Sequence, residues 1–228
     1  MKIGIIGSGN MGRSIGVRFA HLGHEVFFGA RRPEQSTRAA ALAGNGARHG
    51  TNDEAAAFGD VLVWTMRQPD PAAVLRRPAV LDGRVVIDLN NRNYGQEVKS
   101  GAWFAESIAE TLQNNAPQAR VVKALNTIAM EAFDTSPERL TGAGAQTFLA
   151  GDHTEAKEDV AKLVGDLGFE AVDLGSGPAA FRAAEALGDV IRLLMIDGQC
   201  GGRAHLVLKT LPAPDLDTIG VREASNYG

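Results

Sequence analysis

The sequence predicts an α/β protein whose strands form a doubly wound, mostly parallel sheet, with a small helical segment near the carboxyl end. Short apolar runs alternate with stretches of helical spacing, which indicates strands and helices in turn. Most of these runs are continuously apolar, as in strands that are buried on both faces of a parallel sheet. The β-α-β-α order then favours right-handed crossovers between parallel strands.

Composition restricts the class of protein. The chain has 228 residues, 44% of them hydrophobic and 22% charged, which suits one large domain with a buried core. Its net charge of −4 favours neither nucleic acid nor an anionic membrane as a partner. No apolar run approaches the roughly 18 residues that a membrane helix needs, and the first strand starts at Lys2, so we expect a cytoplasmic protein. The lone Cys200 excludes an internal disulfide, and we expect a small buried residue there rather than a catalytic thiol.

Seven strands are expected from the apolar runs between turn signals. They cover residues 2–7, 25–30, 60–66, 84–90, 120–126, 145–151 and 170–175.

Helices are expected between these strands. Residues 10–22 place Met11, Ile15, Phe19 and Leu22 on one helical face. The other expected helices cover residues 33–44, 52–58, 102–114 and 154–167, followed by a long helix over 178–198 and a shorter one over 202–211. The last residues are irregular and polar, which suits an arm that packs on a partner subunit or a frayed end.

The segment GSGNMG, from Gly7 to Gly12, follows an apolar strand and opens a helix, which is the context that a dinucleotide-binding loop requires. Gly7 would allow the tight turn, Gly9 the approach of a pyrophosphate, and Gly12 the close packing of helix on strand. The start of the helix would offer free N–H groups to the phosphates. The sequence therefore predicts a Rossmann-type domain over residues 1–176 and a helical segment over 177–228.

Two arginines stand where a carboxylate would hold the ribose of NAD, about 20 residues beyond the glycine loop. The segment there reads GARR, and no acidic residue occurs before Glu34. The guanidinium groups of Arg31 and Arg32 would bind a 2′-phosphate, so the pair predicts selection of NADP(H) over NAD(H). The alternatives are a solvated surface pair, or one arginine that only stacks on the adenine.

Several segments resemble the NADPH-dependent reductases of the deazaflavin coenzyme F-420, a family that includes the cytoplasmic domains of six-transmembrane metalloreductases. The resemblance runs from residue 2 to about residue 196. Its segments are IGIIGSGNMG, GARR, VIDLNN, VVKALNTI, FLAGD and GFEAVDLGSGPAAFRAAEALGDVIRLLM.

The resemblance implies direct hydride transfer between NADPH and a flavin-like acceptor, either coenzyme F-420 or FMN/FAD. Such a reaction needs positioning rather than a protein nucleophile, and the sequence shows no metal-ligand cluster and no certain catalytic residue. Besides the glycines and arginines, the resemblance places these residues at the cofactor and acceptor: Ser8, Asn10, Met11, Thr65, Met66, Arg67, Asn90, Lys123, Ala124 and Asn126.

Two of these residues have open alternatives. Asn126 would hold the nicotinamide amide, cap a helix over residues 127–134, or do both. Lys123 would serve the acceptor site or be a strand lysine with a structural partner. Asn126 also stands where the archaeal F-420 reductases have a histidine, and the segment DLNNRNYGQ departs from the family's TNP type, so the acceptor stays open.

Two other functions remain open at this point. An imine or carbonyl reductase would use the same glycine loop, with residues 178–200 building the substrate pocket. A non-catalytic redox sensor would bind NADP(H) and report to a partner protein. The wide apolar face of the helix over 178–198 would pack against a second subunit or cover the cofactor cleft, and we expect a homodimer.

Overall fold

The computed structural model describes residues 1–101 and 105–210. Its central sheet is parallel and has the strand order β3-β2-β1-β4-β5-β6, so the expected doubly wound fold is confirmed. The chain begins in the middle of the sheet and winds outward to one edge and then to the other. The strands are β1 (Lys2–Ile6), β2 (Glu25–Gly29), β3 (Arg48–Gly50), β4 (Val61–Trp64), β5 (Val85–Asp88) and β6 (Arg120–Lys123).

The last two strands form a separate parallel pair, β7 (Gln146–Leu149) with β8 (Glu170–Asp173). Lys123 at the end of β6 pairs with Ala150 in an isolated antiparallel bridge, which joins this pair to the main sheet. The two strands therefore continue the protein beyond β6 without extending its parallel ladder.

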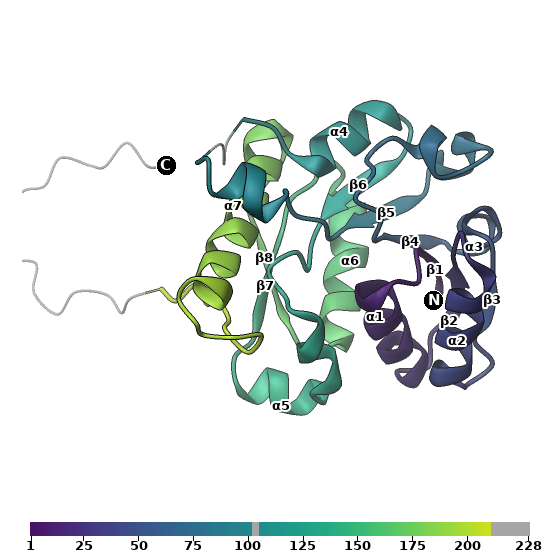
Figure 1. Cartoon of the computed structure of the whole chain (residues 1–228), viewed down its shortest axis with the longest axis horizontal. Helices are drawn as coiled ribbons and strands as arrows, with labels where there is room; N and C mark the ends of the chain where they lie inside the picture. Colours follow the sequence, from purple (N-terminus) through teal and green to yellow (C-terminus); the bar gives the residue numbers. More distant parts are fainter. Residues whose placement is uncertain (102–104, 211–228) are drawn as a thin grey trace, which may run out of the picture.

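Helices cover both faces of the sheet (Figure 1). One core contains the buried sides of α1, α2 and α6, and the other contains those of α3, α4 and α7. The α-helices are α1 (Asn10–His21), α2 (Pro33–Ala43), α3 (Asn52–Phe58), α4 (Ile108–Asn115), α5 (Pro137–Gly142), α6 (Thr154–Asp166) and α7 (Gly177–Ile196). Short helical turns occupy Pro71–Ala73, Pro78–Leu81, Tyr94–Val98 and Met130–Asp134.

Local signals explain where several helices begin. Pro33 occupies the first turn of α2, where its missing N–H has no intrahelical partner to lose. Thr51 and Glu54 form a capping box that starts α3 at the expected residue. Ser107 caps α4, which therefore starts at Ile108, six residues later than expected; residues 102–104 of that predicted helix lie outside the described part.

Three expectations were wrong. Strand β3 was not predicted, because it is only three residues long and none of them is apolar. Residues 202–210 contain no helix: Gly201 has a positive φ of 70°, and His205 and Leu208 instead bond to Gln146 on β7. Cys200 is exposed rather than buried, because it follows the end of α7. The expected tail beyond Leu211 lies outside the described residues.

Candidate cofactor and acceptor site

The glycine loop joins β1 to α1 with the geometry that a phosphate needs. Gly7 has a φ of 100°, and a Cβ at Gly12 would lie 2.0 Å from the carbonyl oxygen of Gly7. A Cβ at Gly9 would meet no atom within 4 Å, so space is open on that side of the loop. No side chain caps α1 and its first turn has no acidic residue, which leaves the first N–H groups and the positive dipole end for an anion.

Two side chains hold this loop in place rather than pointing to a phosphate. The hydroxyl of Ser8, a buried residue, donates to the Gly29 carbonyl at 2.7 Å. The hydroxyl of Thr65, which follows β4, donates to the Gly7 carbonyl at 2.6 Å. Met66 lies against Gly7, because a Cβ there would be 2.7 Å from the Met66 sulfur. Three predicted site residues thus act on the shape of the loop.

Arg31 and Arg32 follow β2 and are both exposed. Arg32 Nε lies 3.8 Å from Glu34 Oε1, but both side chains are about two-thirds exposed, so this ion pair is weak. Within residues 1–101 and 105–210, the two guanidinium groups are therefore available to a charged ligand.

A cavity of about 200 Å³ lies beside Arg31, between the ends of β2 and β4. Its walls include Asn52 and Arg76, which sequence reasoning did not find. Asn52 is only 6% exposed, yet its Oδ1 has no hydrogen-bond partner in the described part of the chain. Arg76 reaches the cavity because its backbone N–H donates to Asp53 Oδ1 at 2.8 Å, a contact across 23 residues that no local pattern reveals.

The ends of β5 and β6 carry a buried ionic cluster. The Lys123 ammonium donates to Asp88 Oδ2 at 2.7 Å, to Glu185 Oε2 at 3.2 Å and to the Asn90 carbonyl. Asn90 Nδ2 in turn donates to Asp88 Oδ1 at 2.6 Å and to the Trp64 carbonyl at 3.0 Å. These contacts favour the structural alternative for Lys123, whose side chain is 0% exposed.

Burial and pairing act against each other in this cluster. Burial alone would lower the pKa of Lys123, but the carboxylates of Asp88 and Glu185 outweigh it and raise the pKa, so the ammonium stays charged. Burial raises the pKa of Asp88, and the neighbouring ammonium opposes that rise. The cluster fixes the backbone of Asn90 where β5 ends.

Asn126 is held between the sheet and α7. Its Nδ2 donates to Asn91 Oδ1 at 3.0 Å and to the Ala184 carbonyl at 2.8 Å, while its Oδ1 is buried and has no partner among the residues that the structure describes. A Cβ at Gly188 would lie 2.1 Å from Asn91 Oδ1, so glycine is what lets α7 approach. Asn126 does not cap a helix, because the next helical turn begins at Met130.

The backbone next to Asn126 is also specialised. Ala124 is fully buried, and its N–H donates to the Asp88 carbonyl at 3.0 Å. Leu125 has a φ of 59°, a left-handed conformation that is costly for a residue with a side chain. The Thr147 hydroxyl accepts from the Leu125 N–H at 3.0 Å and supports this turn.

A second ionic contact ties α7 to the loop after β5. Arg92 Nη1 donates to Asp189 Oδ2 at 2.6 Å, and Arg92 also donates to the Glu106 carbonyl. Burial raises the pKa of Asp189, against the hydrogen bond from Arg92. One side of α7 therefore faces the ends of β5 and β6. It carries the carboxylates of Glu185 and Asp189, and Gly188 between them allows the close approach.

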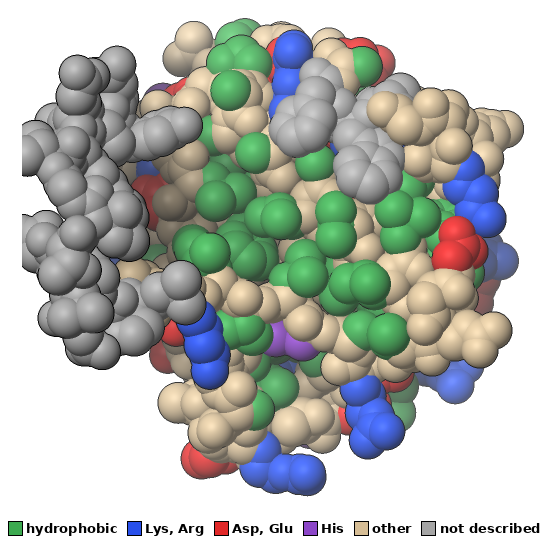
Figure 2. Space-filling model, turned by 90° about the vertical axis from the view of Figure 1, so that its left-hand side faces the viewer, with side chains coloured by type: hydrophobic (Ala, Val, Ile, Leu, Met, Phe, Trp, Pro, Cys, Tyr) green, Lys and Arg blue, Asp and Glu red, His purple; other side chains and the backbone are tan. Residues whose placement is uncertain are grey.

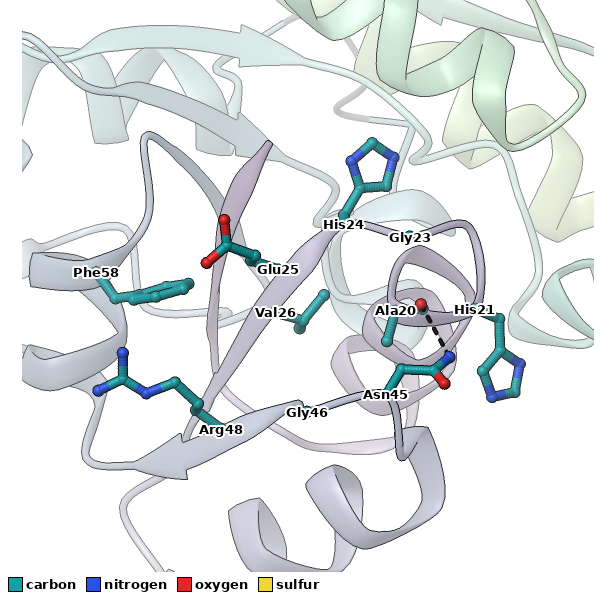
Figure 3. Close-up of a pocket in the computed structure, with 10 residues that line it drawn as sticks. All are labelled: Ala20, His21, Gly23, His24, Glu25, Val26, Asn45, Gly46, Arg48 and Phe58. Carbon is teal, nitrogen blue, oxygen red and sulfur yellow. Dashed lines mark hydrogen bonds between the residues drawn. The ribbon is translucent and has the colours of Figure 1, made fainter.

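The structure thus brings the predicted residues to one end of the sheet, where the carboxyl ends of β1, β2, β4, β5 and β6 lie. A second cavity, of about 380 Å³, lies at the opposite end of the strands, beside His24, Glu25 and Arg48 (Figure 3). Asn45 Nδ2 donates there to the Ala20 carbonyl at 3.1 Å. Open α/β sheets bind ligands at the carboxyl ends of their strands. The candidate site therefore lies at the end of the sheet that carries the glycine loop.

The parallel sheet and the glycine loop at the carboxyl ends of its strands are typical of a dinucleotide-binding fold. Among the described residues, no helix has the length and apolarity to cross a membrane.

Comparison with known proteins places the chain in a family. Residues 2–92 match the family described as "NADP oxidoreductase coenzyme F420-dependent". An F420-dependent NADP reductase of Methanothermobacter thermautotrophicus is 30% identical over 195 residues, which cover 77% of this chain and 81% of that protein. The chain belongs to the coenzyme F-420-dependent NADP oxidoreductase family, as its resemblance predicts.

Two further comparisons agree with this placement, and a third shows a shared fold. Metalloreductase STEAP3 of Rattus norvegicus is 29% identical over 186 residues, but the chain spans only 36% of its length. A crystal structure assigned as an F420-dependent NADP-reductase from Arthrobacter sp. FB24 has a TM-score of 0.69 at 27% identity, over 87% of this chain and 95% of that one. An imine reductase of Bacillus cereus, with a TM-score of 0.60 at 18% identity over 87% of this chain and 63% of that one, shares the fold.

Proposed function

We propose that this protein transfers a hydride between NADPH and a flavin-like acceptor, either coenzyme F-420 or FMN/FAD. The observation that carries the proposal is the ionic cluster at the ends of β5 and β6. All three ammonium hydrogens of Lys123 are directed at oxygens of the chain. A lysine so occupied would hold the strand ends rigid rather than take part in covalent chemistry, which suits a reaction that depends on positioning.

The residues of the site fit NADPH. The open space at Gly9 and the uncapped start of α1 would receive the pyrophosphate. Arg31 and Arg32 would hold the 2′-phosphate, and the cavity with Asn52 and Arg76 would take the adenosine. When bound, NADPH supplies the hydride.

The acceptor end would be built by residues of β4, β5 and β6. We assign Met66, Arg67, Asn90, Ala124 and Asn126 to the nicotinamide and the acceptor, all of which follow or end these strands. The buried cluster would keep Asn90 in register with Asn126, and α7 would exclude water from that side. Ser8, Asn10 and Met11 complete the phosphate loop at the other end.

A second subunit would cover α7 and the segment after it. Leu194, Ile196, Val207 and Leu208 are between 41% and 60% exposed. Figure 2 shows hydrophobic side chains gathered across this side of the molecule. Large exposed apolar surfaces mark interaction sites, so we propose that residues 177–228 form a dimerisation and substrate segment beside a cofactor-binding domain over 1–176. Sedimentation should give a dimer at micromolar concentration, and a monomer would reject this part.

Steady-state oxidation of NADPH tests the proposed function. Coenzyme F-420, FMN, FAD and a panel of small imines and carbonyl compounds would be offered in parallel, with NADH as the control donor. Turnover with a flat-ring acceptor supports the proposal. Turnover with imines or carbonyl compounds alone would make the chain a reductase of small organic substrates instead.

A further inference from the structure

The segment over residues 201–208, which follows α7, is fastened to strand β7. We call this segment the strap. Strand β8 pairs with β7 along the chain, but the N–H of Gln146, at the start of β7, donates to Nε2 of His205 at 2.8 Å. The Leu208 N–H donates to Gln146 Oε1 at 2.7 Å. The strap therefore gives partners to groups of β7 that a neighbouring strand would otherwise have to satisfy.

The hydrogen bonds at Gln146 leave one protonation state for His205. A backbone N–H can only donate, so Nε2 of His205 must carry a free electron pair, and the ring proton resides on Nδ1. An imidazolium has a proton on both nitrogens and would meet the Gln146 N–H as a second donor. The bond between strap and strand therefore exists only while the ring of His205 is neutral.

The ring of His205 lies in a largely apolar wall. Its centre is 6.2 Å from the centre of the Phe169 ring, and both rings line a third cavity, again of about 380 Å³, which has the strap as one wall. The apolar lining of this cavity also includes Ile128, Ala132, Leu140, Ala143 and Ala145. Release of the strap would open this cavity to water.

The charged groups around the ring come from three elements. Glu131, from the turn Met130–Asp134, and Arg203, from the strap itself, line the same cavity. On β8, the carboxylate of Glu170 accepts from Gln146 Nε2 at 2.9 Å, so that carboxylate is bonded to the amide rather than to the imidazole. Burial lowers the pKa of His205 below its ordinary 6.5, which keeps the ring neutral at neutral pH.

We propose that His205 is an acid-sensitive latch, which holds the strap on β7 when its ring is neutral and releases the strap when the ring is protonated. The stabilisation is present above pH 6.5 and is lost as the pH falls through the lower folded value. Val207 and Leu208, which belong to the surface proposed for a second subunit, would move with the strap. The latch does not depend on the proposed hydride transfer, since no cofactor or acceptor takes part in it.

Hydrogen exchange measured by NMR tests the latch, because it reports on single N–H groups. Protection factors, which remove the direct effect of pH on exchange, would be compared at about pH 7.5 and about pH 5. We expect the N–H groups of Gln146 and Leu208 to lose at least about tenfold in protection in acid, because the released ring takes up a proton that the latched ring excludes. The N–H of Ile87, inside β5, should keep its protection and so exclude unfolding of the whole protein.

Two variants separate the acceptor from the charge. His205→Gln places a carboxamide where the imidazole lies, and this side chain accepts from Gln146 without titrating, so protection should be retained at both pH values. His205→Phe keeps an aromatic ring against Phe169 but removes the acceptor, so protection should be low at both. The control is His153→Gln, which removes an exposed histidine before α6 and should leave the acid response of Gln146 as in the native chain.

Equal protection of the Gln146 N–H at the two pH values in the native chain would overturn the latch. An acid loss that persists in His205→Gln, or full protection in His205→Phe, would overturn it as well. If these variants do not fold, nitrogen spectra of the native imidazole carry the test. A proton on Nδ1 at neutral pH, with ring protonation and loss of Gln146 protection at the same pH, supports the latch, and a proton on Nε2 at neutral pH rejects it.

Discussion

The ammonium of Lys123 lies 2.7 Å from a carboxylate oxygen of Asp88, and both side chains are fully buried at the ends of neighbouring strands β6 and β5. A buried ion pair is costly to break, because the remaining charge loses its partner without regaining water. Lys123→Met should therefore lower the free energy of unfolding by about 3–5 kcal/mol.

Denaturant unfolding of Lys123→Met, followed by circular dichroism, would measure this loss. The matched control is Lys157→Met, which removes an ion pair to the half-exposed Asp173 and should cost about 1 kcal/mol or less. Equal losses in the two variants would show that the buried pair gives no special rigidity to the strand ends.

The glycine loop offers a second, paired test. Gly12→Ala would place a Cβ 2.0 Å from the Gly7 carbonyl oxygen, so it should destabilise the fold by about 1–3 kcal/mol and weaken NADPH binding. Gly9→Ala meets open space at an ordinary φ of −68°, so its stability should change by no more than about 0.5 kcal/mol. Because the added methyl group would obstruct the pyrophosphate, Gly9→Ala should still weaken NADPH binding. Thermal unfolding would measure the change in stability, and calorimetric titration would measure the affinity for NADPH. Unchanged NADPH binding in Gly9→Ala would show that the pyrophosphate does not bind at this loop.

We expect Arg31 and Arg32 to select NADPH over NADH. The double variant Arg31→Ala with Arg32→Ala should weaken NADPH binding by about 1.5–3 kcal/mol for each charged hydrogen bond lost, at least roughly tenfold. Binding of NADH should hardly change, because NADH has no 2′-phosphate. Fluorescence titration of the two reduced cofactors would compare the losses, and equal weakening of both would mean that the arginines are misassigned.

A pH effect is expected from the contact between α4 and α7. Arg182 donates to both oxygens of Glu110 at 2.8 Å, and this hydrogen bonding lowers the pKa of Glu110 below the ordinary 4.5. A lowered pKa in the folded state means that the stabilisation is present above pH 4.5 and is lost as the pH falls through the folded value. Native protein should therefore be more stable than Glu110→Gln at pH 7, and the difference should vanish in acid. A difference that does not vary with pH would contradict this assignment.

The order of strands and helices could be predicted because it rests on local signals. Continuous apolar runs marked β1, β4, β5 and β6, and the spacing of the glycines marked the turn into α1. Strand β3 was missed because its three residues carry no apolar pattern, and its place comes from pairing with β2. The absent helix over 202–210 has a similar cause, since contacts with the distant Gln146 decided the conformation.

In the candidate site, too, some residues could be predicted from local sequence signals and others could not. The glycine loop and the two arginines are recognisable from their spacing along the chain. The ionic cluster is not, because Lys123 meets Asp88 across 35 residues and Glu185 across 62. Gly188 carries no signal at all until α7 is seen against Asn91 and Asn126.

Direct passage of a hydride from NADPH to a flavin-like ring can be tested in a single turnover. The protein would be mixed without oxygen with equal amounts of NADPH and one acceptor, either coenzyme F-420, FMN or FAD. The absorbance bands of the nicotinamide and the acceptor would be followed together. We expect both bands to fall at the same rate with at least one acceptor, with one acceptor reduced for each NADPH oxidised. NADH should react much more slowly. Tight binding of NADPH with no change in either band, whichever acceptor is offered, would contradict direct hydride transfer and indicate a sensor of NADP(H).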